Sequence, residues 1–246
     1  MAHPISRDST PPRRWTGIFF DVGGTLLYPD PVVIGDHLEG ILGRGLPEDR
    51  VFAAIQFGSV AIDQAIAQGQ SIERWWHLFF GSVLCHLGFD GAATRSRLDA
   101  LVSDLRACHE KKNLWSYLLP STHGVLETLQ GKGFHLGVIS NSDGKVRGQL
   151  EEAGLAPFFP FILDSHVVGC EKPDPAIFRL ALQESGLPAS EVLYIGDIVA
   201  IDAVGATGVG MSALILDPLR LRAGAAVPTI AGLADLPAWL ESQKGA

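Results

Sequence analysis

The sequence predicts an α/β fold in which a doubly wound parallel sheet carries an inserted α-helical bundle. Apolar runs of strand length recur along the chain, mostly separated by helical patterns, and each run meets polar residues at its carboxyl end. Near-continuous apolar strands of this kind are typical of a parallel sheet that helices cover on both faces. Residues 30–116, in contrast, mostly have the apolar spacing of amphipathic helices, which predicts the inserted bundle.

The first predicted strand ends on a carboxylate. Residues 19–27 read FFDVGGTLL, so an apolar strand delivers Asp21 directly to a glycine turn. This position suits a nucleophile or a metal ligand, because a buried strand holds the acid at the mouth of the fold. The same pattern is also typical of an ordinary strand exit, in which glycine supplies positive φ. The run alone does not decide between the two interpretations.

Four further strands are predicted to bring polar residues to the same edge of the sheet. They cover residues 135–140, 161–164, 192–196 and 212–216. Ligands of open α/β sheets bind at the carboxyl ends of the strands, so we expect the residues that follow these strands to lie near Asp21. Those residues are Ser140, Asn141, Lys172, Asp197 and Asp202.

The inserted bundle is predicted to hold about four helices. Ser71 is a plausible N-cap for one of them, and Trp75 and Trp76 are more typical of a bundle core than of a substrate wall. The helices are expected over residues 72–83 and 98–105 and from near Val32 and Val51. Outside the bundle, a closing surface helix is expected over residues 230–240, and the polar, Pro-rich residues 1–14 are predicted to be a flexible tail rather than a signal peptide.

Four short motifs resemble those of the haloacid dehalogenase-like superfamily of hydrolases. They are DVGGT at residues 21–25, SN at 140–141, KPDP at 172–175 and GDIVAID at 196–202. Together they are highly specific, and the resemblance extends from Ile18 to about Leu240. It implies a Rossmann-like core formed by residues 15–29 and 117–246, with residues 30–116 as a helical cap that closes over the site and selects substrates.

The resemblance implies a Mg²⁺-dependent phosphatase that acts on a small phosphorylated metabolite. Asp21 would attack phosphorus, form an aspartyl-phosphate and be regenerated by water. Mg²⁺ prefers about six oxygen ligands, and the implied protein ligands are Asp21, the backbone carbonyl of Gly23 and Asp197. Asp202 would be a further ligand or an anchor behind them, although an Asp at a helix start also favours the helix dipole.

The resemblance also implies how the phosphate is held. Ser140 would donate a hydrogen bond to a phosphoryl oxygen with help from the N–H of Asn141, Gly24 would contribute to phosphate binding, and Lys172 would supply positive charge beside Asp21. Two alternatives stay open. Ser140 and Asn141 are also typical helix caps, and residues 172–175 are a plausible helix entry, an interpretation we accept for Asp174 and Pro175.

Gly23 departs from the family pattern. Most phosphatases of the family have Asp there, which protonates the leaving oxygen and later activates water. General acid–base catalysis is worth about 10²- to 10⁴-fold, so alkyl phosphates should be poor substrates, whereas acyl or aryl phosphates should suffer least. Alternatively, Asp30, His37, His77 or the substrate itself supplies the proton, although an Asp between prolines is typical of a turn and a lone His is usually structural.

The departure at Gly23 leaves alternative functions open. One is a phosphometabolite-binding pseudoenzyme with little turnover, and another is a dehalogenase-like or phosphonatase-like hydrolase. Dehalogenases of the superfamily need no metal and do not keep the spacing of residues 196–202. Phosphonatases use a cap lysine, and no lysine occurs between Tyr28 and Cys108. Both hydrolase alternatives are therefore disfavoured.

Composition limits the partners and the location. The 246 residues are 47% hydrophobic and carry a formal net charge of -8, which argues against nucleic-acid or membrane-surface binding. No apolar run approaches the roughly 18 residues of a membrane span. Cys85, Cys108 and Cys170 are odd in number and far apart, as expected of reduced thiols in a cytoplasmic protein. The sequence leaves the oligomeric state open.

Overall fold

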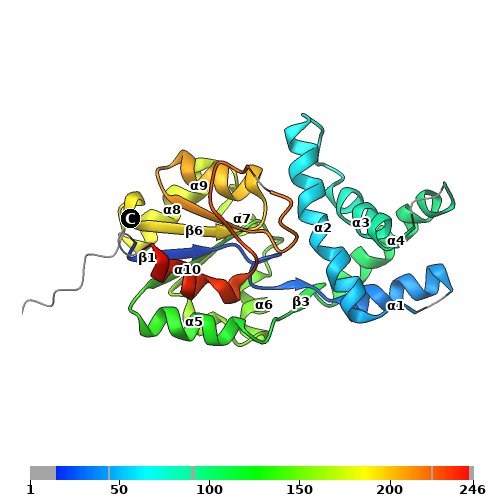
Figure 1. Ribbon diagram of the computed structural model, residues 1–246, viewed down its shortest axis with the longest axis horizontal. Coiled ribbons are helices and arrows are strands. Elements are labelled where there is room, and N and C mark those ends of the chain that lie inside the picture. The colour runs from blue at the N-terminus through cyan, green and yellow to red at the C-terminus, as the bar shows by residue number, and fades with distance from the viewer. Residues whose placement is uncertain (1–14, 44, 90–91, 223, 244–246) are drawn as a thin grey trace, which may run out of the picture.

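The computed structural model describes residues 15–43, 45–89, 92–222 and 224–243. The predicted flexible tail at residues 1–14 lies outside the described residues. Figure 1 shows two lobes, a sheet enclosed by helices and, at its side, a bundle of helices. No helix of the described residues is long and apolar enough to cross a membrane.

A six-stranded parallel sheet forms the centre of the larger lobe. Its strand order is β5-β4-β1-β6-β7-β8. The strands are β1 (Gly17–Phe20), β4 (His135–Ser140), β5 (Phe161–Asp164), β6 (Val192–Gly196), β7 (Ser212–Leu216) and β8 (Thr229–Ile230). The four strands predicted after the first have the bounds that the sequence indicates. Because β1 lies between β4 and β6, the residue that follows it emerges in the middle of the sheet edge.

Helices cover both faces of this sheet. Ile18 and Phe20 of β1 face a cluster that includes α5 (Thr122–Gly131), α6 (Val146–Glu152) and α10 (Leu236–Ser242). Phe19 points to the opposite face and joins the cluster beneath α8 (Pro175–Ser185) and α9 (Val204–Gly208). Alternating side chains of one strand thus enter two separate cores, as the period of two in a strand requires. The predicted α/β fold with a doubly wound parallel sheet is confirmed.

Four helices form the smaller lobe, here called the helical bundle. They are α1 (Pro31–Leu42), α2 (Glu48–Ala67), α3 (Trp75–His86) and α4 (Ala92–Lys111), and they surround a hydrophobic cluster of their own. The chain enters through β2 (Tyr28–Pro29) and returns through β3 (Trp115–Tyr117), which pair antiparallel with each other. The side chain of Asp30 begins α1 by accepting hydrogen bonds from two backbone N–H groups of its first turn.

Two helix boundaries differ from the sequence prediction. The Ser71 hydroxyl accepts a hydrogen bond from the N–H of Glu73 in a turn, and α3 begins later, after Arg74, which makes no side-chain cap. Near the C-terminus, β8 pairs with β7 and precedes a single 3₁₀ turn, η4 (Leu233–Asp235), so α10 begins only at Leu236. In both places the apolar spacing fits a helix, but the residues form other structure: a turn before α3, and a strand and a 3₁₀ turn before α10.

The remaining short elements lie in the loops at the two edges of the sheet. They are η1 (Ala156–Phe158), α7 (Ser165–Val168), η2 (Ala189–Glu191) and the π-helix η3 (Val199–Ala203), with η1 and η2 directly before β5 and β6, and α7 and η3 after them. Asp174 caps α8 by accepting from the N–H of Ala176, and Pro175 occupies its first turn, as the sequence predicts.

Candidate active site

Three aspartates gather at the carboxyl edge of the sheet. Asp21 follows β1, Asp197 follows β6, and Asp202 lies in η3. The backbone N–H of Asp21 donates to the carbonyl of Ile195 over 2.8 Å, which extends the parallel pairing of β1 and β6 to this point. One carboxylate oxygen from each acid lies within 4.8 Å of the others, and all three residues are buried. The fold therefore brings together three acids that lie up to 181 residues apart in the chain.

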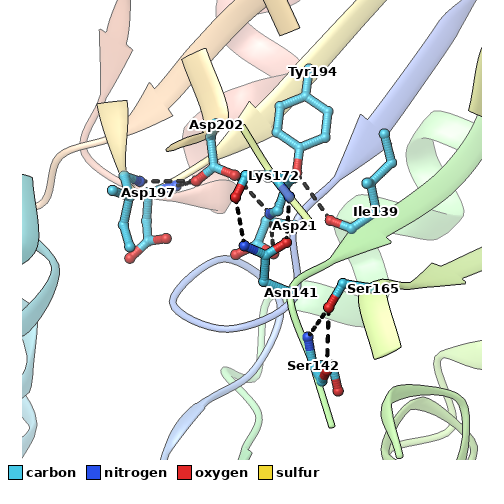
Figure 2. Close-up of polar contacts among 10 residues, drawn as sticks. Asp21, Ile139, Asn141, Ser142, Ser165, Lys172, Tyr194, Asp197 and Asp202 are labelled. Atoms are coloured by element: carbon cyan, nitrogen blue, oxygen red, sulfur yellow. Dashed lines mark hydrogen bonds and ion pairs between the residues drawn. The ribbon is translucent and has the colours of Figure 1, made fainter. Parts of the chain in front are cut away.

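Lys172 lies among these acids. Its ammonium donates to Oδ1 of Asp21 and to Oδ1 of Asp202, both over 2.7 Å, and to the hydroxyl of Tyr194 over 2.9 Å (Figure 2). The Lys172 side chain is 2% exposed. One buried cation thus compensates part of the charge of three buried acids, and the cluster keeps a negative balance that suits a further cation.

Asn141 fixes the backbone on which Lys172 is carried. Its side-chain oxygen accepts from the N–H of Lys172 over 2.8 Å, and its side-chain nitrogen donates to the Lys172 carbonyl over 2.9 Å. The capping alternative for Asn141 is not observed, because α6 begins only at Val146 and the residue at its N-cap is Lys145. Asn141 instead joins the loop after β4 to the loop that carries the lysine.

Tyr194 is a member of the site that the sequence reasoning missed. Its hydroxyl lies 3.0 Å from the carbonyl oxygen of Ile139 and 3.3 Å from Oδ1 of Asp202, and it accepts from Lys172. The side chain is completely buried within β6. A tyrosine in an otherwise apolar central strand was the available signal, because a buried phenol needs a hydrogen-bonding partner.

Asp202 is occupied on both oxygens. Oδ1 accepts from Lys172, and Oδ2 accepts from the backbone N–H groups of Asp197 and Ile198 over 3.1 and 3.0 Å. These bonds hold the turn that presents Asp197. Gly196 is needed there, because a Cβ at that position would collide with the Asp202 carboxylate. The geometry therefore favours Asp202 as an anchor behind the cluster.

Asp197 presents an unpaired carboxylate oxygen to the site. Its Oδ1 is buried and has no hydrogen-bond partner among the described residues. Gly24, with φ of 79°, allows this close approach, since a Cβ on Gly24 would collide with the Asp197 carboxylate. The N–H of Gly24 donates to the carbonyl of Leu27, so the phosphate contact expected of Gly24 stays a prediction. An unpaired buried carboxylate oxygen is costly, and a bound cation removes that cost.

Burial and the charges of neighbouring acids raise the proton affinity of Asp21 and Asp197. Burial raises the pKa of the Asp21 carboxyl to about 6, although Lys172 opposes the rise. Burial, together with the charges of Asp202 and Asp21, raises the pKa of Asp197 well above its ordinary value. For Lys172, burial alone would lower the pKa, but the two neighbouring carboxylates outweigh it and the pKa rises. This set of oxygen donors with surplus negative charge fits a hard divalent cation such as Mg²⁺.

The loop after β4 is held from the neighbouring strand. The Asp164 carboxylate accepts from the N–H groups of Gly144, Val146 and His166. The Ser165 hydroxyl exchanges hydrogen bonds with the backbone of Ser142 (Figure 2). Ser140 ends β4 beside Asp164 and is 4% exposed. The sequence reasoning missed this support, for which the acid at the end of FILD was the only signal.

The space beside Gly23 is covered by an aromatic ring. A Cβ on Gly23 would lie 3.2 Å from both Cδ1 and Nε1 of Trp115. The three residues considered as replacement proton donors interact elsewhere. Asp30 caps α1, Nδ1 of His37 lies 2.8 Å from the carbonyl oxygen of Val33, and Nε2 of His77 lies 3.0 Å from Oδ1 of Asp99. None of these interactions involves Asp21.

A polar junction joins the helical bundle to the sheet lobe. Asp63 of α2 accepts from the N–H groups of Val199 and Ala200 over 3.1 and 2.9 Å, at the start of η3. The same carboxylate pairs with Arg222 over 3.0 Å, and Arg222 donates to the Ser59 hydroxyl over 3.0 Å. The junction lies directly beside Asp197, so the position of the bundle is coupled to the site.

Known proteins are similar to this chain in sequence. The model of the haloacid dehalogenase-like hydrolase family matches residues 15–210. A haloacid dehalogenase-like hydrolase domain-containing protein 3 from Danio rerio is 32% identical over 61% of this chain and 61% of its own length. A phosphoglycolate phosphatase from Pseudomonas syringae pv. tomato is 30% identical over 80% of this chain and 68% of its own length. The chain thus spans about 61% of the length of the first of these relatives.

Solved structures share the fold over nearly the whole chain. A putative HAD-hydrolase YfnB from Bacillus subtilis, bound to magnesium, is 21% identical with a TM-score of 0.64, covering 93% of this chain and 99% of its own. A 2-haloacid dehalogenase from Pseudomonas syringae pv. tomato is 26% identical with a TM-score of 0.54, and the match covers 93% of this chain and 99% of its own. At 21% identity, the first likeness supports the fold alone.

Proposed function

The chain belongs to the haloacid dehalogenase-like hydrolase family, and from that premise we propose that it is a Mg²⁺-dependent phosphatase of a small phosphorylated metabolite. The observation that carries the proposal is the ion pair of Asp21 and Lys172 beside the unpartnered Asp197 oxygen. Residues 30–116 would act as the substrate-selecting cap of a core made of residues 15–29 and 117–246, and the protein would work in the cytoplasm.

Asp21 is the proposed nucleophile. We assign the attack to Oδ2, because Lys172 occupies Oδ1. With a pKa of about 6, the carboxyl is mostly ionised at neutral pH. Oδ2 forms a bond to phosphorus, the bond from phosphorus to the leaving oxygen breaks, and the leaving oxygen keeps the electron pair. The product of this step is an aspartyl-phosphate on Asp21.

Asp21, the carbonyl of Gly23 and Asp197 would hold Mg²⁺, with Asp202 behind them, and the ion would neutralise charge on the transferring phosphoryl group. Ser140 and the N–H of Asn141 would bind phosphoryl oxygens, and the Lys172 ammonium would add positive charge from the opposite side.

Water completes the cycle by attacking phosphorus. The bond between phosphorus and Asp21 breaks, Asp21 regains its electron pair, and inorganic phosphate leaves with both protons of the water. Since Gly23 has no side chain to take a proton, we expect this step and the departure of poor leaving groups to be slow, by about 10²- to 10⁴-fold relative to a site with a general acid–base group.

A phosphatase panel tests the proposal. Purified protein with Mg²⁺ should release phosphate from aryl or acyl phosphates, and Asp21→Asn should abolish the release. Gly23→Asp should raise the rate on alkyl phosphates by about 10²-fold or more, provided that Trp115 moves aside. The proposal fails if neither the wild type nor Gly23→Asp turns over any member of the panel.

The ring beside Gly23 supports a second candidate, a phosphometabolite-binding pseudoenzyme. In that case Mg²⁺ with a phosphorylated ligand should raise the unfolding temperature without turnover, and the absence of any shift would exclude it. The likeness to a 2-haloacid dehalogenase keeps a third, less favoured candidate open. Halide release that persists in EDTA would support dehalogenation, whereas strict dependence on Mg²⁺ would exclude it.

A further inference from the structure

Trp115 lies beside Gly23, the position at which most phosphatases of the family have an Asp side chain. Its Cδ1 and Nε1 are the nearest atoms to a Cβ built on Gly23, at 3.2 Å each. Gly23 lies two residues after the proposed nucleophile and would contribute its carbonyl to Mg²⁺. A group beside Gly23 therefore borders the proposed nucleophile and metal site, and in this protein that group is an indole N–H.

The indole is held firmly in this position. Trp115 belongs to β3, which pairs with β2 opposite Pro29, and its backbone N–H donates to the side chain of Asn113 over 2.8 Å. Its ring packs against Trp75, Trp76, Phe79 and His109, with ring centroids 5.5 to 6.1 Å apart. The return strand of the helical bundle thus delivers a rigid aromatic group to the site.

The N–H of this indole is available to a ligand. Trp115 is half-buried, and among the described residues its Nε1 takes part in no hydrogen bond. Indole nitrogen is a donor only and keeps its proton in water, so it can stabilise a developing anion but cannot protonate it. This property separates it from a carboxylic acid in the same space.

We propose that Trp115 is the residue that selects the substrate, by donating a hydrogen bond to the oxygen that joins phosphorus to the leaving group. The inference rests on the proposed phosphatase function and narrows it. The enzyme takes phosphates whose leaving oxygen departs as an anion without a proton, which is the chemistry of aryl and acyl phosphates. Asp21 forms the new bond to phosphorus, and the leaving oxygen departs with its electron pair while the indole keeps its hydrogen.

A series of aryl phosphates with phenols of graded acidity tests the hydrogen bond. Trp115→Phe keeps an aromatic ring and removes the N–H. We expect kcat to fall by about 10- to 100-fold, as for a lost bond to a charged oxygen, with the larger losses on the less acidic phenols. Trp75→Phe is the matched control, because its ring lies in the same cluster, 5.7 Å from Trp115. It should lower all rates by one small factor. A loss in Trp115→Phe that is independent of the phenol, or no greater than in the control, overturns the inference.

Binding provides a readout that needs no turnover. In an Asp21→Asn background with Mg²⁺, calorimetry compares phenyl phosphate with benzylphosphonate, which has a methylene group in place of the bridging oxygen and keeps the phenyl ring. Adding Trp115→Phe should weaken phenyl phosphate binding by about 3- to 10-fold and leave benzylphosphonate binding unchanged. Equal effects on both ligands, or no binding of phenyl phosphate, overturn the inference. If the binding difference holds but the wild type hydrolyses nothing, the phosphatase function fails and the Trp115 contact stands.

Discussion

At the scale of single residues, the site depends on one lysine that balances buried acids. Removing one partner of a buried ion pair leaves an uncompensated charge and costs about 3–5 kcal/mol. We expect Lys172→Met to lose that much unfolding free energy in EDTA at neutral pH and to lose turnover by about 10²-fold or more. Urea denaturation and a phosphatase assay measure the two effects.

The control for Lys172→Met is Lys132→Met, because Lys132 forms a partly exposed ion pair with Glu241 far from the acids. Exposed pairs contribute about 0–1 kcal/mol, so this variant should retain both its stability and its turnover. If Lys172→Met were as stable as Lys132→Met, the buried acids would not need the lysine charge for folding.

Gly24 supports a second prediction at this scale. Its φ of 79° disfavours any side chain, and a Cβ would also strike the Asp197 carboxylate. Gly69 has φ of 69° with no atom within 4 Å of its Cβ position, so Gly69→Ala has the backbone cost alone, about 1–2 kcal/mol. We expect Gly24→Ala to be less stable than Gly69→Ala and to weaken Mg²⁺ binding by about 10-fold or more, measured by calorimetry. Equal Mg²⁺ affinity in the two variants would contradict the close approach to Asp197.

At the scale of elements, the junction of α2 and η3 connects the helical bundle to the site. Asp63 there satisfies two backbone N–H groups and one arginine that is 6% exposed. Asp63→Ala should leave these donors without their acceptor, at a cost of about 1–3 kcal/mol each before water enters. We expect faster hydrogen exchange at residues 198–202, together with lower turnover, because water then reaches the site.

Asp99→Ala provides the comparison for the junction. Asp99 pairs with Arg74 on the surface of the helical bundle, where both side chains are mostly exposed. It should leave exchange at residues 198–202 unchanged. Exchange there that stays at the wild-type rate in Asp63→Ala would mean that the junction does not hold the start of η3.

The elements also explain what the sequence could predict. The four predicted strands after β1 are continuous apolar runs that a local pattern identifies, and their carboxyl ends led directly to Lys172, Asp197 and Asp202. The sequence did not predict β2, β3 and β8, which have two or three residues each, because only tertiary pairing makes them strands. Trp115 in β3 was not predicted as a site residue either, since its place in the site depends on its contact with Gly23, more than ninety residues earlier. Tyr194 was not predicted as a site residue, because a tyrosine fits an apolar strand and only the structure shows that its hydroxyl contacts Lys172.

At the scale of the whole molecule, the fold keeps buried acids together at a cost in stability. A carboxyl with a raised pKa binds its proton more tightly in the folded chain than in the unfolded chain. It therefore favours folding at low pH, and this contribution is lost as the pH rises through the folded pKa. For Asp21, a rise from 3.8 to about 6 corresponds to a loss of about 3 kcal/mol between roughly pH 4 and pH 7. The apo protein is thus weakened at the pH where it would work.

Mg²⁺ should reverse this weakness, because it binds the ionised carboxylates and competes with protons. We expect the unfolding temperature in Mg²⁺ to equal that in EDTA near pH 5 and to exceed it increasingly towards pH 8. Asp197→Asn removes one acid of the cluster, so it should reduce both the loss of stability with pH in EDTA and the gain with Mg²⁺. Comparing the two proteins cancels the titration of the carboxyls outside the cluster. A Mg²⁺ gain that is independent of pH, or that persists in Asp197→Asn, would mean that the ion binds elsewhere.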